Sequence, residues 1–143
     1  MREILIPGGL QTRIAQEARA ALPRECCGLL VGTVEGERFR VLYLRATRNM
    51  ATEPDRFEID PGVHIALMRA LRGTGRGIIG CYHSHPNGSD GPSEHDRASG
   101  FEIGFVWLIA AISGAKTQLR AFLREETDFR ELTLLDRVPA RTV

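Results

Sequence analysis

Cysteine is scarce in this chain of 143 residues, and its pattern excludes a disulfide framework. There are three cysteines, an odd number, and two of them, Cys26 and Cys27, are adjacent in an apolar run. Small disulfide-stapled domains instead carry an even set of spaced cysteines. We therefore expect Cys26, Cys27 and Cys81 to be reduced core residues, and none to be a nucleophile, because no neighbour that would stabilise a thiolate is evident.

Long apolar runs and an excess of one charge are also missing. No apolar segment approaches the roughly 20 residues of a membrane helix, so no membrane association is expected. The apolar stretch within residues 1–7 is too short for a secretory signal, which makes the cytoplasm the expected compartment. The formal net charge of +1 argues against nucleic acid as the main partner. No feature of the sequence indicates an oligomeric state.

The length and the absence of repeats or linkers predict a single domain over residues 1–143, large enough for a hydrophobic core. Apolar alternation and turn residues predict strands over 2–6, 25–34, 38–46, 56–60, 77–85, 105–112, 117–124 and 129–135. Helical periodicity and capping signals predict helices over 10–22, 60–71 and 93–100, with Gly8 and Gly9 in a break before the first. We expect a loose tail from Val138. The mixture indicates an α/β (α+β) fold, with helices on a mixed or antiparallel sheet.

Residues 80–96, GCYHSHPNGSDGPSEHD, concentrate the chemistry of the chain. Alternate side chains of a strand share a face, so His83 and His85 should point the same way and can reach one metal ion. Ser93 is the expected N-cap of a following helix, and Asp96 lies one turn further along. Two histidines and one aspartate suit a catalytic zinc, which uses three protein ligands and keeps a fourth position open. We predict His83, His85 and Asp96 as ligands, with the Ser93 hydroxyl near the metal.

Simpler interpretations exist for each part of this motif. Ser93 and Asp96 alone match a capping box, which needs no metal. A charged residue such as Glu25, at the edge of an apolar strand, is ordinarily exposed or paired with an arginine such as Arg24. His64 has no spaced partner and is expected to be a packing or surface residue. The metal interpretation depends on the pieces occurring together.

Taken together, Glu25 within PRECCGLLVG and the pattern H-x-H-x7-S-x2-D resemble the JAMM (MPN+, Mov34/PAD-1-like) zinc metalloproteases. The resemblance implies a three-layer α-β-α domain around a curved sheet and one zinc ion per chain. It also implies that Glu25 accepts a proton from water and passes it to a departing amine, while Ser93 stabilises the negative oxygen that develops. His95 is not a ligand in this pattern.

The reaction implied is hydrolysis of a peptide or isopeptide bond. The chain is similar to compact bacterial members of the family, which resemble enzymes that trim the C-terminus of a ubiquitin-like sulfur-carrier protein. Such a tail would bind as an extended strand beside a sheet edge, with the loop 49–56 as a candidate flank of its groove. A non-catalytic scaffold module of the same fold, or an amidase acting on small molecules, are the alternative functions.

Overall fold

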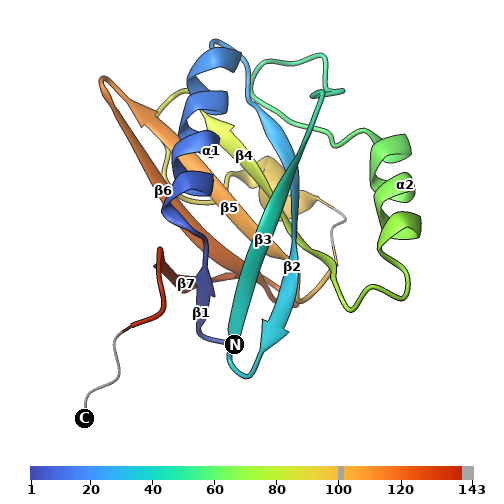
Figure 1. Cartoon of the computed structure of the whole chain (residues 1–143). Coiled ribbons are helices and arrows are strands. Elements are labelled where there is room, and N and C mark those ends of the chain that lie inside the picture. Colours follow the sequence, from blue (N-terminus) through green and yellow to red (C-terminus); the bar gives the residue numbers. More distant parts are fainter. Residues whose placement is uncertain (100–101, 140–143) are drawn as a thin grey trace.

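The computed structural model describes residues 1–99 and 102–139 and shows a curved β-sheet with helices packed on it (Figure 1). The described residues form seven strands: β1 (Glu3–Leu5), β2 (Cys27–Glu35), β3 (Arg38–Thr47), β4 (Gly77–His85), β5 (Val106–Ser113), β6 (Lys116–Arg124) and β7 (Phe129–Leu135). They also form three helices: α1 (Gly8–Ala21), α2 (Pro61–Leu71) and α3 (Glu94–Ala98). The predicted combination of helices with a single sheet is confirmed.

The sheet is mixed, as predicted, and it closes on itself. The strands lie in the order β1-β3-β2-β4-β5-β6-β7, and β1 pairs with both β3 and β7. β1 is parallel to both neighbours and β4 is parallel to β5, whereas the other pairs are antiparallel. Closure was not predicted, because it depends on pairing between the two ends of the chain, which leaves no local signal in the sequence.

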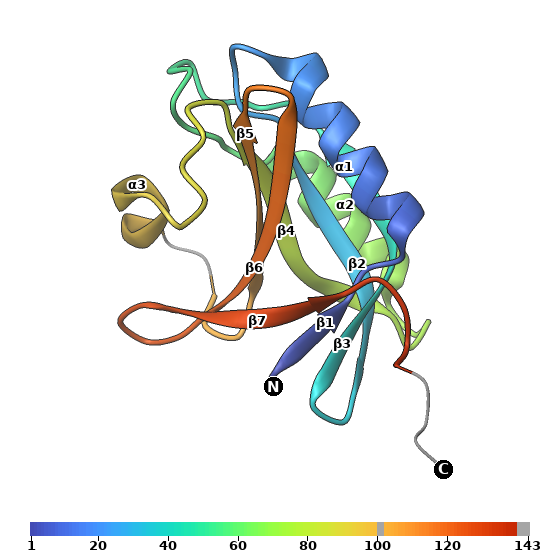
Figure 2. The ribbon, with the colours of Figure 1, turned by 90° about the vertical axis from the view of Figure 1, so that its left-hand side faces the viewer.

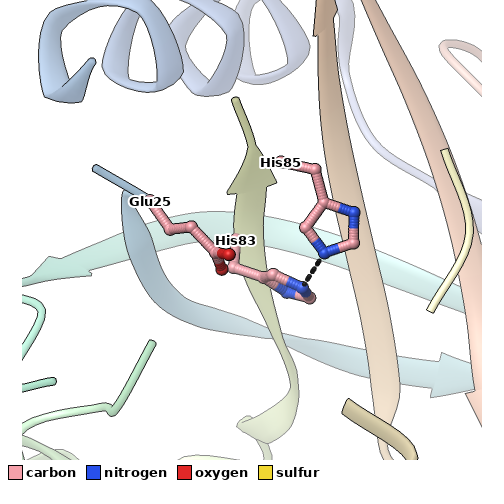
Figure 3. Close-up of side chains that lie close together, drawn as sticks. All are labelled: Glu25, His83 and His85. Carbon is pink, nitrogen blue, oxygen red and sulfur yellow. Dashed lines mark hydrogen bonds between the residues drawn. The ribbon is translucent and has the colours of Figure 1, made fainter. Parts of the chain in front are cut away.

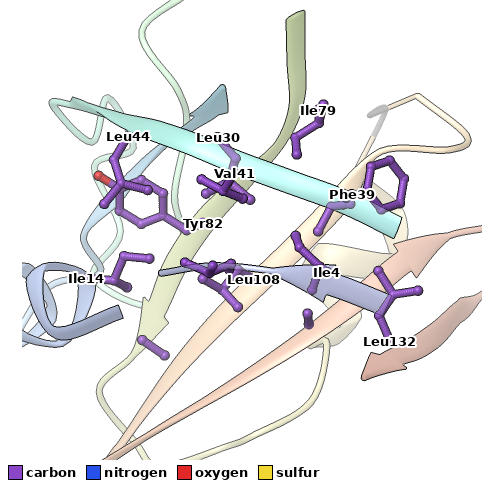
Figure 4. Close-up of a cluster of buried hydrophobic side chains, with 14 of the residues drawn as sticks. Ile4, Ile14, Leu30, Phe39, Val41, Leu44, Ile79, Tyr82, Leu108 and Leu132 are labelled. Atoms are coloured by element: carbon purple, nitrogen blue, oxygen red, sulfur yellow. The ribbon is translucent and has the colours of Figure 1, made fainter. Parts of the chain in front are cut away.

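Two apolar clusters lie on opposite faces of the sheet and produce the predicted α-β-α layers. The larger one packs under α1 and includes Ile14 and Tyr82 (Figure 4). The smaller one includes Cys81 and Trp107, and Leu67 of α2 packs against it. The neighbours Cys81 and Tyr82 fall into different clusters because successive side chains of a strand alternate. The short helix α3 lies on the opposite side of the sheet from α1 (Figure 2).

Tyr82 fixes β4 from the α1 side. Its ring crosses the backbone of β2 at Gly28, where an added Cβ would lie 2.3 Å from the ring, so only glycine permits this approach. The Tyr82 hydroxyl donates a hydrogen bond of 3.0 Å to the Glu17 carboxylate of α1. Because of the strand alternation, these contacts turn the side chains of His83 and His85 to the other face.

Two predicted boundaries need correction at the start of the chain and after β3. Gly8 and Gly9, predicted to break the chain, form the first turn of α1, where backbone N–H groups lack intrahelical partners in any case. Residues 56–60 form no strand. Their alternation reflects Phe57 and Ile59 facing the smaller apolar cluster, and a single bridge from Asn49 to Ile59 is their only ladder contact among the described residues.

The C-terminal predictions fall partly outside the described chain. The helix predicted over 93–100 spans Glu94–Ala98, and Gly100 lies outside the described residues. Val138 is exposed, and all but two residues of the predicted tail are likewise outside that part. Within residues 1–99 and 102–139, no helix is long and apolar enough to cross a membrane.

Candidate metal centre and active-site cleft

The end of β4 and the start of α3 bring three metal-binding side chains to one point. His83 Nε2 lies 3.1 Å from His85 Nε2 and 3.2 Å from Asp96 Oδ2. His85 Nε2 lies 3.3 Å from the same carboxylate oxygen. All three side chains are buried, with relative exposures of 0, 4 and 4%. The structure therefore brings together the ligand set predicted from the sequence.

The size of this triangle suits a tetrahedral metal ion. Ligand nitrogen and oxygen atoms lie about 2.0–2.1 Å from zinc, so two ligand atoms at a tetrahedral angle are about 3.3–3.4 Å apart. The separations of 3.1, 3.2 and 3.3 Å are close to this value without any movement of the side chains. Nitrogen and carboxylate donors are also those that zinc accepts.

The tautomer of His85 supports the same conclusion. His85 Nδ1 lies 2.8 Å from the Ser89 carbonyl oxygen, which can only accept, so Nδ1 carries a hydrogen and Nε2 of the neutral ring is bare. That nitrogen faces a carboxylate oxygen of Asp96, which is also an acceptor. Two acceptors at this distance need a proton or a cation between them. The residues present therefore fit a metal ion, and the Ser89 carbonyl is the outer group that orients the imidazole.

Ser93 and Asp96 form the capping box that the simpler interpretation predicted. Ser93 Oγ accepts from the Asp96 N–H at 3.0 Å, and Asp96 Oδ2 accepts from the Ser93 N–H at 2.8 Å. The oxygen that caps the helix is the one that faces both histidines. Capping and metal binding are thus compatible, because the cap fixes the carboxylate in the orientation that the metal site requires.

Phe57 covers the imidazole of His83, the more deeply buried of the two histidines of β4. Its ring stacks on His83, with centroids 4.2 Å apart and planes 16° from parallel. Trp107 contacts both rings edge-on at 5.5 Å. His83 Nδ1 is buried and has no hydrogen-bond partner among the described residues. On its Nδ1 side, this imidazole is therefore held by aromatic packing and not by a hydrogen bond.

Glu25 lies beside the histidines although it precedes β2 by two residues (Figure 3). One ligand-type atom from each of Glu25, His83 and His85 lies within 4.8 Å of the other two. The adjoining residue, Cys26, exchanges two hydrogen bonds with Ser84 of β4, of 2.8 and 3.2 Å. Glu25 is 5% exposed, so the interpretation as an exposed carboxylate paired with Arg24 does not describe it.

The pKa values of the two carboxyl groups of the site, Glu25 and Asp96, are shifted in opposite directions when no metal is bound. Burial raises the pKa of Glu25 from 4.5 to about 7, against the opposing effect of His85. Burial acts the same way on Asp96, but hydrogen bonds from His83 and His85 outweigh it and hold the pKa of Asp96 well below its usual range. Asp96 is therefore ionised, as a metal ligand would have to be, while Glu25 can exchange a proton near neutral pH.

The pKa values of the two imidazoles are also shifted in opposite directions. Burial lowers the pKa of His83, because the charged ring would have to lose its hydration. Burial acts in the same direction on His85, but the hydrogen bonds to Asp96 and to the Ser89 carbonyl reverse it, so the pKa of His85 is raised. A neutral His83 is the form that can bind a metal.

One cavity of about 300 Å³ joins these residues to the surface. Glu25, His85 and Ser93 line it, together with Asp55 and His95. His95 Nε2 lies 3.8 Å from Asp55 Oδ2, and His95 is half exposed. A larger cavity of about 600 Å³, lined by His64 and others, lies at the end of α2 and contains none of the predicted site residues.

No cysteine belongs to the cluster of metal-binding side chains among the described residues. All three cysteines are free thiols, with Cys27 and Cys81 buried and Cys26 half-buried. Burial raises the pKa of each, to about 12 for Cys26, so their thiolates are disfavoured at neutral pH.

Several residues that build the site gave no signal in the sequence. Phe57 stacks on His83, and Asn49 donates to the backbone carbonyl of Glu25 at 3.0 Å. Arg124 of β6 donates to the carbonyls of Asp96 and Arg97 at 3.4 and 2.8 Å, which holds α3 against the sheet. Each acts across 24 or more positions of sequence, so no local motif marks it.

Comparison with known proteins agrees with this geometry. A family model for prokaryotic homologs of the JAB domain matches residues 7–125. A desampylase of Haloferax volcanii is 33% identical over 113 residues, covering 78% of each chain. The 26S proteasome non-ATPase regulatory subunit 14 of Dictyostelium discoideum is 36% identical over 77 residues, which are 52% of this chain and 25% of that protein.

Solved structures share the fold over nearly the whole chain. A protein from Desulfitobacterium hafniense superposes with a TM-score of 0.83 at 27% identity, covering 92% of this chain and 91% of that one. A JAB1/MPN domain protein from Archaeoglobus fulgidus superposes with a TM-score of 0.59 at 21% identity, covering 94 and 99%. With the family match extending over residues 7–125, the chain belongs to the prokaryotic JAB-domain family, and so to the JAMM/MPN proteins that its motif resembles.

Proposed function

We propose that this protein is a zinc metallopeptidase that hydrolyses an amide bond at the C-terminus of a ubiquitin-like sulfur-carrier protein or of its conjugates. The observation that carries the proposal is the convergence of His83 Nε2, His85 Nε2 and Asp96 Oδ2 beside the buried carboxylate of Glu25. Similarity to a desampylase supports the substrate class, because the family that the motif resembles includes isopeptidases acting on ubiquitin-like proteins. The free cysteines agree with a reducing compartment such as the cytoplasm.

His83, His85 and Asp96 are the residues that would hold the metal. Glu25 could compete as a third ligand, since its carboxylate is within 4.8 Å of both histidines. Asp96 is favoured because one oxygen is already 3.2–3.3 Å from both imidazoles and its low pKa keeps it ionised. A zinc ion bound there supplies a Lewis acid that activates water and polarises the scissile carbonyl.

Glu25 is then free to act as the proton carrier. Its buried carboxylate lies beside both histidines, where it can take a proton from the attacking water and return it to the departing amine. The proton thus moves from water to the leaving group through one side chain, and the products are a carboxylate and a free amine. Burial in the 300 Å³ cavity limits access of other water to the carboxylate.

Ser93 supplies a hydrogen-bond donor in the same cavity. Its oxygen already accepts from the Asp96 N–H, which leaves the hydroxyl hydrogen to donate. A donor aimed at the oxygen that becomes negative lowers the barrier more than one aimed at the ground state. Both Ser93 and Glu25 line the same cavity, as this division of roles requires.

Intact-mass spectrometry of two substrates tests the proposal. One is a ubiquitin-like sulfur carrier bearing a C-terminal cysteine in peptide linkage, and the other carries a lysine-linked peptide in isopeptide linkage. We expect the zinc-loaded wild type to release the amine from at least one of them. Glu25→Gln should still bind zinc but leave both intact over the same reaction time, with only a slow residual rate detectable at high enzyme concentration. The proposal fails if zinc-loaded wild type leaves both intact, or if Glu25→Gln cleaves at the wild-type rate.

A further inference from the structure

Asn49 lies at the base of a loop over residues 50–58. Its side chain forms hydrogen bonds with backbone groups inside this loop. Its Oδ1 accepts from the N–H groups of Ala51 and Glu58 at 2.9 and 3.0 Å. Its Nδ2 donates to the carbonyls of Arg56 and Glu25 at 2.9 and 3.0 Å. A primary amide offers two donors and two acceptor positions, so all four are used. Three of these bonds are to residues of the loop, and the fourth is to the backbone carbonyl of Glu25, the proposed proton carrier.

The same loop contacts the site at three other points. The Arg24 guanidinium donates to the carbonyls of Ala51 and Thr52, which ties the loop to the residue before Glu25. Phe57 stacks on His83, and Asp55 lines the cavity that contains Glu25. The loop is therefore a wall of the site, and Asn49 is the side chain that joins its interior to the backbone of Glu25.

We propose that Asn49 is a positioning residue that sets the backbone of Glu25 relative to the two histidines. Glu25 precedes β2, so the sheet ladder does not hold its own carbonyl, and the Asn49 amide is the group that bonds it. Loss of this bond lets the carboxylate move relative to the substrate, and displacement of a catalytic group by about 1 Å can lower a rate roughly 100-fold. The inference rests on the proposed role of Glu25.

A double-mutant cycle separates positioning from general loosening of the fold. We expect Asn49→Ala and Asn49→Asp to lower kcat roughly 10- to 100-fold with zinc content unchanged. Asn49→Asp is nearly isosteric but sets a carboxylate oxygen against the Glu25 and Arg56 carbonyls, so it tests the donated bonds. Glu58→Ala, an exposed side chain of the same loop whose backbone bond to Asn49 persists, should keep wild-type kcat. In a Glu25→Gln background, either Asn49 change should alter the residual rate less than about twofold.

Hydrogen exchange of the zinc-loaded proteins gives a readout that does not need activity. Peptides covering residues 50–58 should exchange at least about tenfold faster in both Asn49 variants, but not in Glu58→Ala. Additive rate losses in the cycle, or unchanged exchange in the Asn49 variants, would overturn the positioning role. If wild type cleaves neither substrate, the proposed function fails, whereas unchanged exchange counts against Asn49 alone.

Discussion

Ser93 and Asp96 cap each other at the start of α3, and the capping oxygen of Asp96 is the one that faces both histidines. The helix that follows is only five residues long, too short to be stable by itself. Asp96 is its one buried residue, so the helix presents a single carboxylate to the site. The Ser93–Asp96 cap holds the first turn of α3, and the guanidinium of Arg124 holds the carbonyls of Asp96 and Arg97 further along the helix.

Ser93 is both the cap of α3 and the proposed donor to the reacting carbonyl oxygen, so Ser93→Ala should have two separable effects. We expect the loss of the cap to destabilise the protein by about 1 kcal/mol, as measured by urea unfolding. We also expect a loss of the donor to slow amide hydrolysis roughly 10²–10³-fold, as measured by kcat. Ser93→Thr retains a hydroxyl that can do both and should stay close to wild type in both measurements. A normal rate with reduced stability would leave Ser93 as a helix cap only.

Much of the site was predictable because its parts are local. The alternation of a strand sets His83 and His85 on one face, and a capping signal sets the start of the helix that carries Asp96. The strands flanking these residues were also predicted, since their apolar runs are bounded by clear turns. Local patterns of this kind carry structural information within a few residues.

The rest depends on contacts between distant segments. Residues 56–60 alternate like a strand, yet Phe57 faces the ring of His83 and, of these residues, only Ile59 pairs with Asn49. The burial of Glu25 arises from its place beside the end of β4, fixed by the bonds between Cys26 and Ser84. No propensity or spacing within 25–60 encodes these relationships, so the resemblance to a family could supply the role of Glu25 but not its surroundings.

Glu25 should make the metal-free protein less stable as the pH rises. Its pKa is about 7 in the folded protein and near 4.5 when unfolded, so the folded state binds more protons between these values. The free energy of unfolding therefore falls as pH increases through this window. In urea unfolding with a chelator present, we expect Glu25→Gln to gain about 2–3 kcal/mol relative to wild type between pH 5 and pH 8.

The measured quantity is the difference in unfolding free energy between Glu25→Gln and wild type. The contributions of the other titrating groups, which both proteins share, largely cancel in this difference. Glu53→Gln serves as the matched control, because Glu53 is a fully exposed carboxylate of the loop 50–58. A hydrogen bond from its own backbone lowers its pKa, so Glu53 stays ionised across this pH range. The unfolding free energy of Glu53→Gln should follow that of wild type across the same pH range. A pH-independent difference between Glu25→Gln and wild type would show that Glu25 is not a buried carboxylate with a raised pKa.

Metal binding should stabilise the folded protein and require Asp96. Zinc binds the assembled triangle and not the unfolded chain, so the melting temperature of metal-free wild type should rise with zinc concentration. Asp96→Asn preserves the shape and an acceptor for the Ser93 N–H but removes the charge that faces both histidines. We expect its zinc affinity to fall at least roughly 100-fold by chelator competition. Equal affinity in Asp96→Asn would point to Glu25 as the third ligand instead.

Phe57 should contribute to metal affinity although it cannot bind a metal. It stacks on His83 at 4.2 Å and is the aromatic ring that lies flat on a ligand whose Nδ1 has no partner in the described chain. Phe57→Leu keeps an apolar side chain but lets the imidazole turn, so we expect roughly tenfold weaker zinc binding in a chelator competition. Phe129→Leu is the control, because Phe129 packs edge-on against Trp107 in the same cluster, at 5.2 Å. Equal losses in both variants would mean that the cluster as a whole, and not the stacked pair, orients His83.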